Sequence, residues 1–471
     1  MLYLIVHAAL IVAVMVRIVL RPHREPASRI AWIAVVAALP VLGLLAYVVL
    51  GEVRLGRRRV QRLRRAIAAL PPTPLDSGGK ELQLADLPGR LQPLFTLGKS
   101  INGFWPHGGN TAELMAGSDE AIAAIVADID AARDHVHVLF YIWLPDNNGL
   151  KVVEALKRAA KRGVTCRAMV DDLGSRTMIR SAHWQAMRAA GVHLAQALPR
   201  RPFYGRLDLR NHRKIVVIDD SVTYCGSQNC ADAAFLIKAK YAPWVDIMVR
   251  FEGPLARQNQ YLFLADWTAH TGEHLSDLLT RPLREVPGAT VIAQAIGTGP
   301  ITRPLAMPEV FLTLIYAARR ELTITTPYYV PNEALQTALC NCARRGVRTT
   351  IVFPARNDSR IVGAASRSYY GDLLAAGVEI WEYQGGLLHT KSLTLDSKLT
   401  LIGSANLDRR SFDLNFENNA LVWDIGLTEA VRTRQQSYIV RSRAVTAAEV
   451  DAWPWYRRLF HNAVAMLGPV I

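Results

Sequence analysis

The sequence has few of the residues that cross-link small secreted domains or hold structural metals. Its five Cys, in a chain of 471 residues, are an odd and scattered set: Cys166, Cys225, Cys230, Cys340 and Cys342. They form neither a disulfide framework nor the paired C-x-x-C spacing of a zinc site. A dense acidic cluster and an H-E-x-x-H motif are also missing, so neither a metal nor another cofactor is expected.

Lysine is absent from residues 1–65, although this region carries eleven Arg against two acidic residues. The region therefore holds +9 of the chain's net charge of +15, and the other 406 residues hold only +6. That surplus is small for a nucleic-acid-binding surface, and no nucleic acid is expected as a partner. Because the Arg residues lie beside apolar stretches, the composition points to a membrane bilayer.

Two apolar stretches near the N-terminus contain almost no charge. The stretch Ile30–Leu50 has 21 residues and no charged side chain, which is enough to cross a hydrocarbon core of about 30 Å. Leu2–Leu20 contains only Arg17, near its end, where a long side chain can reach the headgroups. We therefore expect residues 1–52 to form two membrane-spanning helices, with a cleaved signal peptide as the less favoured alternative for the first.

The distribution of Arg predicts how these helices are oriented. The loop between them, residues 21–29, has three Arg, and the segment from Arg54 to Arg65 has seven. The more basic side of a membrane protein is normally cytoplasmic, so the large C-terminal part is expected there. Residues 53–97 are expected to be a basic juxtamembrane segment followed by a linker rich in Pro and Gly.

The globular part of the sequence is an internal duplication. Residues 160–164 (AKRGV) match 343–347 (ARRGV), and residues 190–192 match 376–378, at offsets of 183 and 186. Such a period is far too long for a solenoid. The first copy follows the order helix, strand, helix, strand over residues 123–132, 135–143, 149–162 and 164–171. We expect two related α/β domains, 98–287 and 288–471, each with a mixed sheet flanked by helices.

Each half contains one copy of a motif with the form H-x-K-x4-D-x6-G-S-x-N. Its members are His212, Lys214, Asp219, Ser227 and Asn229 in the first half, and His389, Lys391, Asp396, Ser404 and Asn406 in the second. Two copies of five fixed positions do not arise by chance in a chain with only 12 His. Side chains two apart on a strand share a face, so each copy is expected to project an imidazole and an ammonium into one site.

Two such sets facing each other suit a phosphodiester. The lysines, serines and asparagines of both copies would bind the non-bridging oxygens and compensate their charge. One His would attack phosphorus and form a phosphohistidine, while the other protonates the departing alcohol and then activates the incoming alcohol or water. Asp219 and Asp396 complete the candidate catalytic set, although each ends its strand beside a turn, where a structural hydrogen bond is the more common role.

The duplicated motif resembles the phospholipase D superfamily. Other stretches, together with the apolar N-terminus, resemble the bacterial cardiolipin synthases: Phe140-Tyr141-Ile142, Thr326–Pro331 and Asn406–Phe412. The resemblance implies a metal-independent transfer of a phosphatidyl group from one phosphatidylglycerol to another, with release of glycerol. It also implies an enzyme of the bacterial inner membrane that acts on this anionic phospholipid.

The same resemblance implies roles for individual residues. His212 matches the nucleophile and His389 the general acid and base of the family. Asp246 and Glu417 match acidic residues that orient the catalytic histidines, with the pairing expected to cross between halves. The two copies differ after their Asn, because the Asp-Arg-Arg-Ser run of residues 408–411 has no counterpart after Asn229.

Several alternatives stay open at this point. The motif indicates phosphodiester chemistry but does not identify the acceptor, so a phospholipase D using water and a transferase with phosphatidylethanolamine as donor both fit. A nuclease is disfavoured by the apolar N-terminus, and a binding protein with an inactive site by the complete motifs. The basic loop 199–211 fits a phosphate site or a solvated surface. For the C-terminal stretch Tyr456–Ile471, core packing is slightly favoured over an amphipathic membrane-seeking end.

Overall fold

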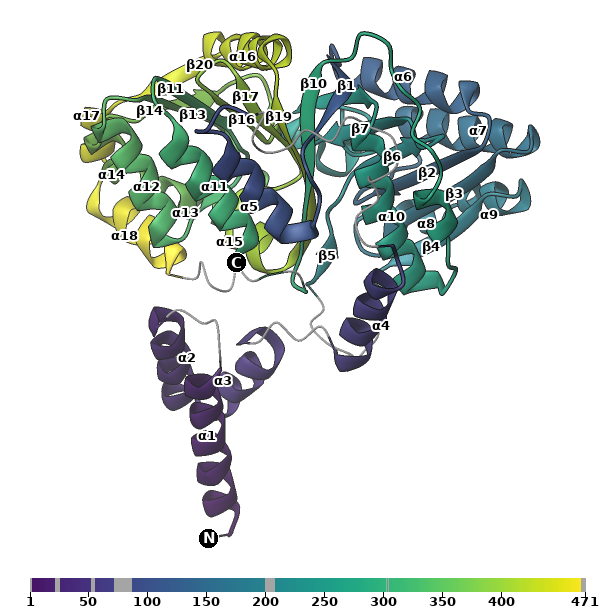
Figure 1. The fold of residues 1–471 in the computed structure, drawn as a ribbon. Helices are drawn as coiled ribbons and strands as arrows, with labels where there is room; N and C mark the ends of the chain where they lie inside the picture. Colours follow the sequence, from purple (N-terminus) through teal and green to yellow (C-terminus); the bar gives the residue numbers. More distant parts are fainter. Residues whose placement is uncertain are drawn as a thin grey trace.

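The N-terminal helices extend below a two-lobed body in the computed structural model (Figure 1), which describes residues 2–21, 26–51, 56–71, 87–199, 208–301, 303 and 305–466. They are α1 (Leu2–Leu20), α2 (Pro26–Ala38), α3 (Pro40–Ala46) and the π-helical turn η1 (Tyr47–Gly51). The basic helix α4 (Arg57–Ala68) follows and lies against the body.

The two predicted apolar helices differ in continuity. The first stretch is one helix, whereas the second, expected as one membrane-spanning helix, is divided into α2 and α3 at Leu39, next to Pro40. Proline has no N–H to donate to the preceding turn, and it fits best in the first turn of a helix, where α3 begins. No helix among the described residues has the length and apolar character needed to cross a bilayer.

The predicted basic juxtamembrane segment is a helix docked on the body. Leu63 of α4 is buried against Leu198, Leu209 and Phe416. The Arg59 side chain donates a hydrogen bond to the carbonyl oxygen of Pro199 at 3.1 Å. The predicted Pro- and Gly-rich linker and residues 200–207 of the basic loop lie outside the described residues.

The body is built on one long mixed sheet that repeats a single strand order twice. From the outer edge inward, the first half has the order β4-β3-β2-β6-β7-β9-β1, and the second has β14-β13-β11-β16-β17-β19-β10. The halves join where β1 and β10 pair antiparallel. Within each half, two neighbouring strand pairs are parallel and the other pairs are antiparallel. The duplication predicted from the sequence is therefore present in the strand order.

The strands of the first half are β1 (His107–Leu114), β2 (His135–Phe140), β3 (Thr165–Asp171), β4 (His193–Ala197), β5 (Arg210–Asn211), β6 (Ile215–Ile218), β7 (Val222–Gly226), β8 (Trp244–Val245) and β9 (Met248–Glu252). Those of the second half are β10 (Val291–Thr298), β11 (Glu321–Thr325), β12 (Tyr329–Val330), β13 (Arg348–Pro354), β14 (Glu379–Tyr383), β15 (Leu387–Leu388), β16 (Ser392–Leu395), β17 (Leu399–Gly403), β18 (Leu407–Asp408), β19 (Asn415–Trp423) and the edge strand β20 (Ser442–Val445). The short members β5, β8, β15 and β18 adjoin the repeated motifs.

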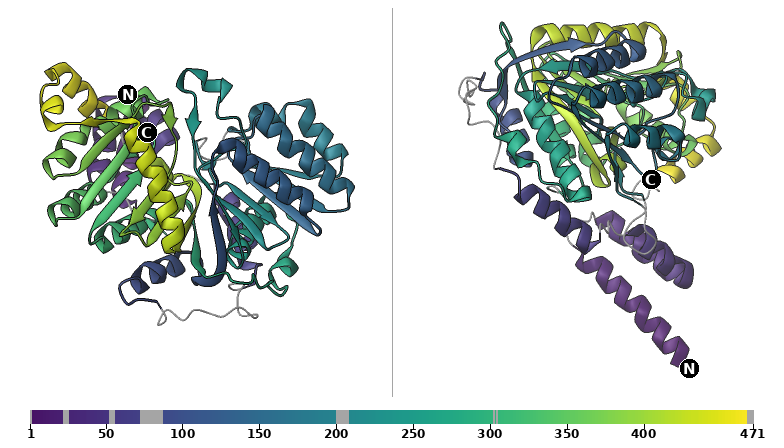
Figure 2. Two further views of the ribbon diagram at one scale, coloured as in Figure 1. Left: turned by 90° about the horizontal axis from the view of Figure 1, so that it is seen from above. Right: turned by 90° about the vertical axis from the view of Figure 1, so that its right-hand side faces the viewer.

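Helices cover both faces of the sheet, as Figure 2 shows from above. The first half has α6 (Ser118–Ala131), α7 (Asn147–Lys161), α8 (Arg176–Ile179), α9 (Ala182–Ala189), η3 (Leu236–Tyr241), α10 (Leu255–Thr271) and η4 (Ser276–Leu279). The second has α11 (Ala306–Ala317), α12 (Glu333–Arg344), α13 (Arg360–Ser368), α14 (Tyr370–Ala375), α15 (Arg409–Asp413), α16 (Ile425–Val440), α17 (Ala447–Asp451) and α18 (Trp455–Ala465). All five Cys are buried free thiols.

Helix α5 (Gln92–Asn102) packs on the half that follows later in the sequence. Leu94 and Phe95 belong to the core of the second half, together with residues of α11. The predicted domain boundary at residue 98 falls inside this helix. The chain thus crosses the second half before it enters the first, which ties the two halves together.

Candidate active site

The two motif copies meet between the halves at the lower edge of the body. In Figure 1, β5 and α15, which adjoin the first and second copies in sequence, both lie at this edge. His212–Lys214 connect β5 to β6, and His389–Lys391 connect β15 to β16. The H-x-K residues were predicted on strands, but they lie in the links between strands.

Two short ladders between the halves place each histidine. β5 pairs with β19 in parallel, and β15 pairs with β8 in parallel. The backbone N–H of His212 donates to the carbonyl oxygen of Phe416 at 2.9 Å, and that of His389 donates to the carbonyl oxygen of Val245 at 2.8 Å. His212 is thereby fixed beside Glu417, the residue after Phe416. His389 is fixed beside Asp246, the residue after Val245.

Each imidazole is held by a carboxylate from the opposite half. His212 Nδ1 lies 2.9 Å from Glu417 Oε2, and His389 Nδ1 lies 2.7 Å from Asp246 Oδ1. A carboxylate can only accept, so Nδ1 carries the proton in both rings and Nε2 keeps its lone pair. The structure therefore brings together the same pairs that the sequence analysis expected.

The two motif serines donate hydrogen bonds to the carboxylates. Ser404 Oγ donates to Glu417 Oε2, and Ser227 Oγ donates to Asp246 Oδ1 at 2.6 Å. Both serines are fully buried. Their predicted role as phosphate ligands was wrong, because their only hydroxyl protons are already engaged with anions that need compensation. Asn415 Nδ2 adds a third hydrogen bond to Glu417, at 3.1 Å from Oε1.

The two lysines are buried and differ in their contacts. Lys214 Nζ donates to the carbonyl oxygen of His212 at 2.7 Å. Lys391 Nζ donates to the equivalent oxygen of His389 at 2.7 Å and also to His389 Nε2 at 2.8 Å. Burial lowers the pKa of Lys214 to about 8 and that of Lys391 to about 7. A bound anion would favour the charged form of both groups.

The histidines are neutral at physiological pH. Burial lowers the pKa of His212 to about 4, although the charge of Glu417 opposes the shift. Burial lowers the pKa of His389 as well, against the opposing charge of Asp246. For Glu417 and Asp246, burial favours the neutral acid, but the facing imidazoles and lysines outweigh it and leave both pKa values below the ordinary range. The site thus combines neutral imidazoles with ionised carboxylates.

The two motif asparagines are buried and have different partners. Asn229 Oδ1 accepts a hydrogen bond from the backbone N–H of Ile142 at 3.2 Å, which orients its amide nitrogen as a donor. Asn406 is buried, and its side-chain oxygen has no hydrogen-bond partner within the described part of the chain. These two amides remain candidate phosphate ligands.

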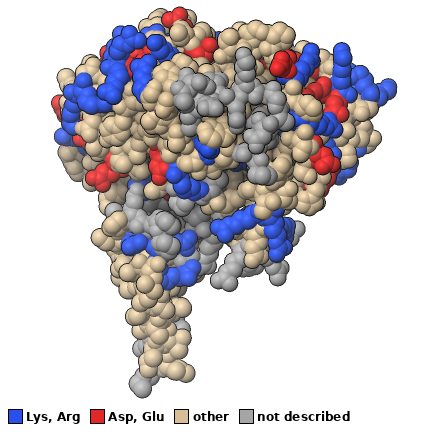
Figure 3. Space-filling model, viewed as in Figure 1, with Lys and Arg blue, Asp and Glu red and all other residues tan. Residues whose placement is uncertain are grey.

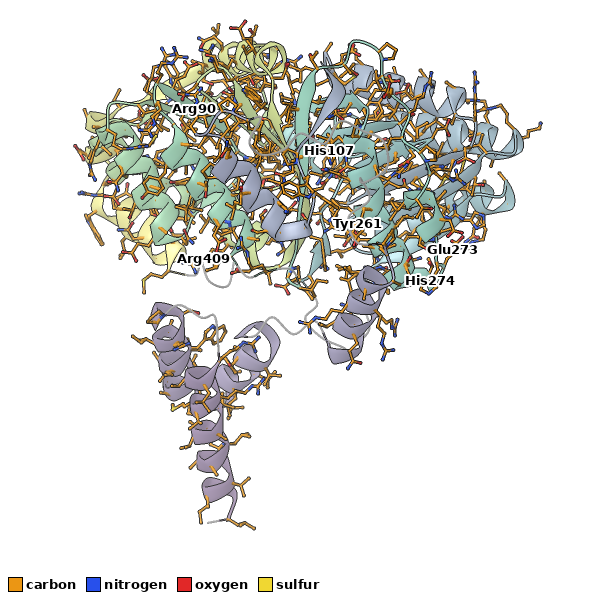
Figure 4. The ribbon with its side chains drawn as sticks, in the orientation of Figure 1. Arg90, His107, Tyr261, Glu273, His274 and Arg409 are labelled. Carbon is orange, nitrogen blue, oxygen red and sulfur yellow. The ribbon has the colours of Figure 1, made fainter. Side chains whose placement is uncertain are left out.

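The two motif aspartates lie away from the site and were wrongly included in the catalytic set. Asp219 accepts three backbone N–H groups from residues 133–135, and Asp396 accepts three from residues 319–321. Each follows a four-residue strand whose other end carries the H-x-K residues, a separation of more than about 13 Å. Asp396 Oδ2 also lies 4.0 Å from Arg90, which Figure 4 places well above Arg409 at the lower edge.

Sequence reasoning missed the aromatic rings that flank the histidines. The Tyr141 ring packs edge-on to His212 with centroids 4.9 Å apart, and the Trp244 ring lies 4.7 Å from His389. Two buried acids, Asp171 and Asp408, were not among the predicted site residues; burial raises the pKa of each to about 6. Trp244 could have been found by its position, two residues before Asp246.

No three His, Cys, Asp or Glu side chains among the described residues are arranged to hold a metal ion. Lys214 and Lys391 place two amino groups beside the histidines. The sequence of the chain matches a known family. The family model described as cardiolipin synthase, phospholipase D-like domain, matches residues 125–262 and 311–438. The chain belongs to the cardiolipin synthase family of phospholipase D-like proteins.

Relatives with curated names cover nearly the whole chain. Cardiolipin synthase A of Cronobacter sakazakii is 37% identical over 98% of this chain and 96% of its own length. The protein of that name from Klebsiella pneumoniae is 36% identical over 98% of this chain and 96% of its own length. A second family model, described as phospholipase D-nuclease N-terminal, matches residues 9–52.

One solved structure shows the same fold. The crystal structure of phosphatidylserine synthase from Haemophilus influenzae superposes with a TM-score of 0.60 and 16% sequence identity. It covers 80% of this chain and the whole of the other. The likeness extends over both halves of the body, so the paired arrangement of the halves is common to the two proteins.

Proposed function

We propose that this protein is a cardiolipin synthase that transfers a phosphatidyl group from one phosphatidylglycerol to a second, giving cardiolipin and glycerol. The full-length similarity to cardiolipin synthases identifies it as a phosphatidyltransferase. The observation that supports the mechanism is the crossed pairing of His212 with Glu417 and of His389 with Asp246. Each half supplies one imidazole and the carboxylate that orients the other.

In the first half-reaction, His212 Nε2 attacks the phosphorus of the donor lipid. The P–N bond forms as the P–O bond to the glycerol headgroup breaks. His389 Nε2 protonates the departing glycerol oxygen, and Lys391 Nζ, 2.8 Å from that nitrogen, supplies the proton. Glu417 stabilises the positive charge that develops on the His212 ring.

In the second half-reaction, the neutral His389 removes a proton from a headgroup hydroxyl of the second phosphatidylglycerol. The resulting oxygen attacks phosphorus, the P–N bond breaks, and His212 regains its lone pair. Lys214, Lys391 and the amides of Asn229 and Asn406 face the non-bridging oxygens in both steps. The phosphodiester's negative charge favours the protonated form of Lys214 throughout. Lys391 gives up its proton through His389 in the first half-reaction and regains it through the same ring when His389 deprotonates the incoming hydroxyl.

The N-terminal helices are proposed to hold the enzyme at its lipid substrate. Their apolar side chains, among them Leu2, Leu10, Leu20, Val41 and Leu45, are exposed. Figure 3 shows described Lys and Arg side chains gathered where these helices meet the body. Residues 1–52 form the membrane hairpin in this proposal, and the body lies on the cytoplasmic side of a bacterial inner membrane.

The test is a reaction of the purified full-length protein with phosphatidylglycerol vesicles, without divalent metal, followed by mass spectrometry of the lipids. Cardiolipin and free glycerol in equal amounts are expected. Phosphatidic acid without cardiolipin would instead make the protein a phospholipase D that uses water. Full turnover by a His212→Ala variant would contradict the mechanism, whatever the product.

A further inference from the structure

Helix α18, at the C-terminal end of the described chain, presents its apolar side to solvent. Its inner side packs on α13, where Val464 contacts Ala364 and Ala365. On its outer side, Trp455 is 71% exposed and Leu459 is 59% exposed. A helix on the surface of a soluble domain normally has the opposite arrangement.

The exposed apolar side chains form one continuous band along α18. Trp455, Leu459 and Met466 follow a spacing of four and seven residues, and Tyr456 and Phe460 lie beside them with a spacing of four. All five are exposed. The earlier preference for core packing of this stretch was therefore wrong for residues 456–466, of which His461 and Val464 are the buried members; residues 467–471 lie outside the described chain.

Basic side chains border this band. Arg457 and Arg458 are exposed, and α18 contains no Asp or Glu. The Arg457 guanidinium lies 4.3 Å from the Trp453 ring, which fixes it beside the helix. Trp and Tyr together with Arg on an apolar helix face are the composition of a helix that lies in the headgroup region of an anionic bilayer.

The position of α18 agrees with a lipid surface. Figure 1 and the right-hand view of Figure 2 place it at the lower edge of the body, the side from which the N-terminal helices extend and at which the motifs meet. Other exposed apolar side chains lie on α13 and η3. Ile361 of α13 is exposed, and near it Asp358 pairs with Lys238 of η3, whose Leu236 and Ile237 are exposed too.

We infer that α18 is an interfacial membrane helix whose outer band, residues Trp455, Tyr456, Leu459, Phe460 and Met466, binds an anionic lipid surface beside the active site. A second copy of the chain fits this band less well. A symmetric pair of helices would bring the bordering arginines of both copies together, whereas lipid phosphates would neutralise them. The helix would hold the site's mouth against the bilayer that contains both substrates.

The test uses the full-length protein with a pyrene label at Leu459→Cys, which is selective because the native cysteines are buried. In phosphatidylglycerol vesicles that contain a nitroxide-labelled lipid, we expect strong quenching of this label. The matched control is Glu429→Cys on α16, at the opposite edge of the body, whose label should stay unquenched. The readout does not depend on the reaction, so it can fail or succeed whether or not cardiolipin forms.

Each of the following results would overturn the inference. Equal quenching of both labels, or none at Leu459→Cys, would show that α18 does not enter the interface. Excimer emission from Leu459→Cys that grows with protein density would show that the band covers a second copy instead.

A variant with Trp455→Ser, Leu459→Ser and Phe460→Ser gives an independent measure, because lost burial of three such side chains should weaken vesicle-dependent turnover by about tenfold or more. An equal loss on detergent-dispersed short-chain phosphatidylglycerol would mean that the band is only structural.

Discussion

The two histidine sites have the same crossed frame but differ around the reactive nitrogen. At His389, Lys391 Nζ donates to Nε2 at 2.8 Å, whereas Lys214 reaches only the main-chain oxygen of His212. His389 Nε2 is thus in contact with a proton donor, and His212 Nε2 is the nitrogen whose lone pair no described side chain occupies. A nucleophile needs a free lone pair and an acid needs a proton.

The duplication therefore supplies two histidines that are held in the same way by a carboxylate. The neighbouring side chains then determine which histidine acts as nucleophile and which as acid. Both carboxylates are held by a motif serine, but Glu417 gains an extra hydrogen bond from Asn415. The facing His212 ring, Lys214 and Ser404 outweigh burial and hold the pKa of Glu417 below its ordinary range, and the Asn415 amide adds one more donor to the carboxylate. We therefore propose His212 as the nucleophile and His389 as the general acid and base. The following comparisons between variants test this assignment.

The largest expected effect is the difference in turnover between the His212→Ala and His389→Ala variants. Loss of the nucleophile should lower turnover of phosphatidylglycerol by about 10⁵-fold or more, and loss of the acid by about 10²- to 10⁴-fold. With a phosphatidyl p-nitrophenol donor, whose leaving group needs no proton, His389→Ala should still release one equivalent of nitrophenol. Mass spectrometry should then find a phosphatidyl adduct on His212.

A nitrophenol burst from His212→Ala, or an adduct on His389, would reverse the assignment. Wild-type protein treated with the same donor is the reference for the size of the burst. Both variants are expected to fold, because the imidazoles occupy a site whose frame is made by backbone ladders.

The next effect separates the two carboxylates. Glu417→Gln should slow formation of the phosphohistidine by about 10²-fold or more, since a neutral amide no longer stabilises the charged His212 ring. Breakdown of the intermediate should change less, because that step removes the charge. In rapid-quench measurements with the nitrophenyl donor, Asp246→Asn should leave the burst intact and slow the later turnover. Equal slowing of both steps by Glu417→Gln would sink the crossed assignment.

The two lysines should lose their positive charge at different pH values. Lys391, with a pKa of about 7, loses its charge before Lys214, with a pKa of about 8. As pH rises, kcat/KM should therefore begin to fall near pH 7. In Lys391→Met the remaining fall should occur near pH 8, and in Lys214→Met it should stay closer to pH 7. Profiles of kcat/KM at constant ionic strength test this order, and an unchanged midpoint in Lys391→Met would contradict it.

The smallest expected effect on turnover is that of substituting Asp219 or Asp396, which lie away from the site. Each aspartate accepts three backbone N–H groups, so Asp→Ala at either position should lower the free energy of unfolding by about 1–3 kcal/mol. Turnover per folded molecule should not change. Urea unfolding of the two variants, with activity measured below the transition, provides the check. A large loss of turnover without a loss of stability would return these residues to the catalytic set.

Some parts of the site follow from local sequence and others do not. The histidines and lysines were identified because their spacing repeats, and the structure places each lysine beside its histidine. The serine hydroxyls were misassigned, because a strand pattern does not say whether Ser227 and Ser404 face a ligand or a neighbouring carboxylate. The aspartates were misassigned because a shared motif suggested a shared site, although a four-residue strand separates them from the histidines.

The membrane region divides in a similar way. Composition alone identified the apolar stretches before residue 52 and the basic segment after it. The break at Pro40 was visible as a residue, but its outcome, two helices in place of one, depends on the geometry of the turn. The exposure of α18 could not be read from sequence, because an apolar band faces a core or a lipid surface according to what packs beside it.

The sequence by itself determined the duplication, the pair of H-x-K motifs and hence phosphodiester chemistry, because spacing and residue type are local properties of the chain. Tertiary structure alone decided the pairing: Glu417 and His212 are 205 residues apart, and Asp246 and His389 are 143 apart. Strand ladders between the halves bring them within hydrogen-bond distance. Burial in that contact sets the pKa values and the tautomers, since desolvation and facing charges exist only in the folded chain.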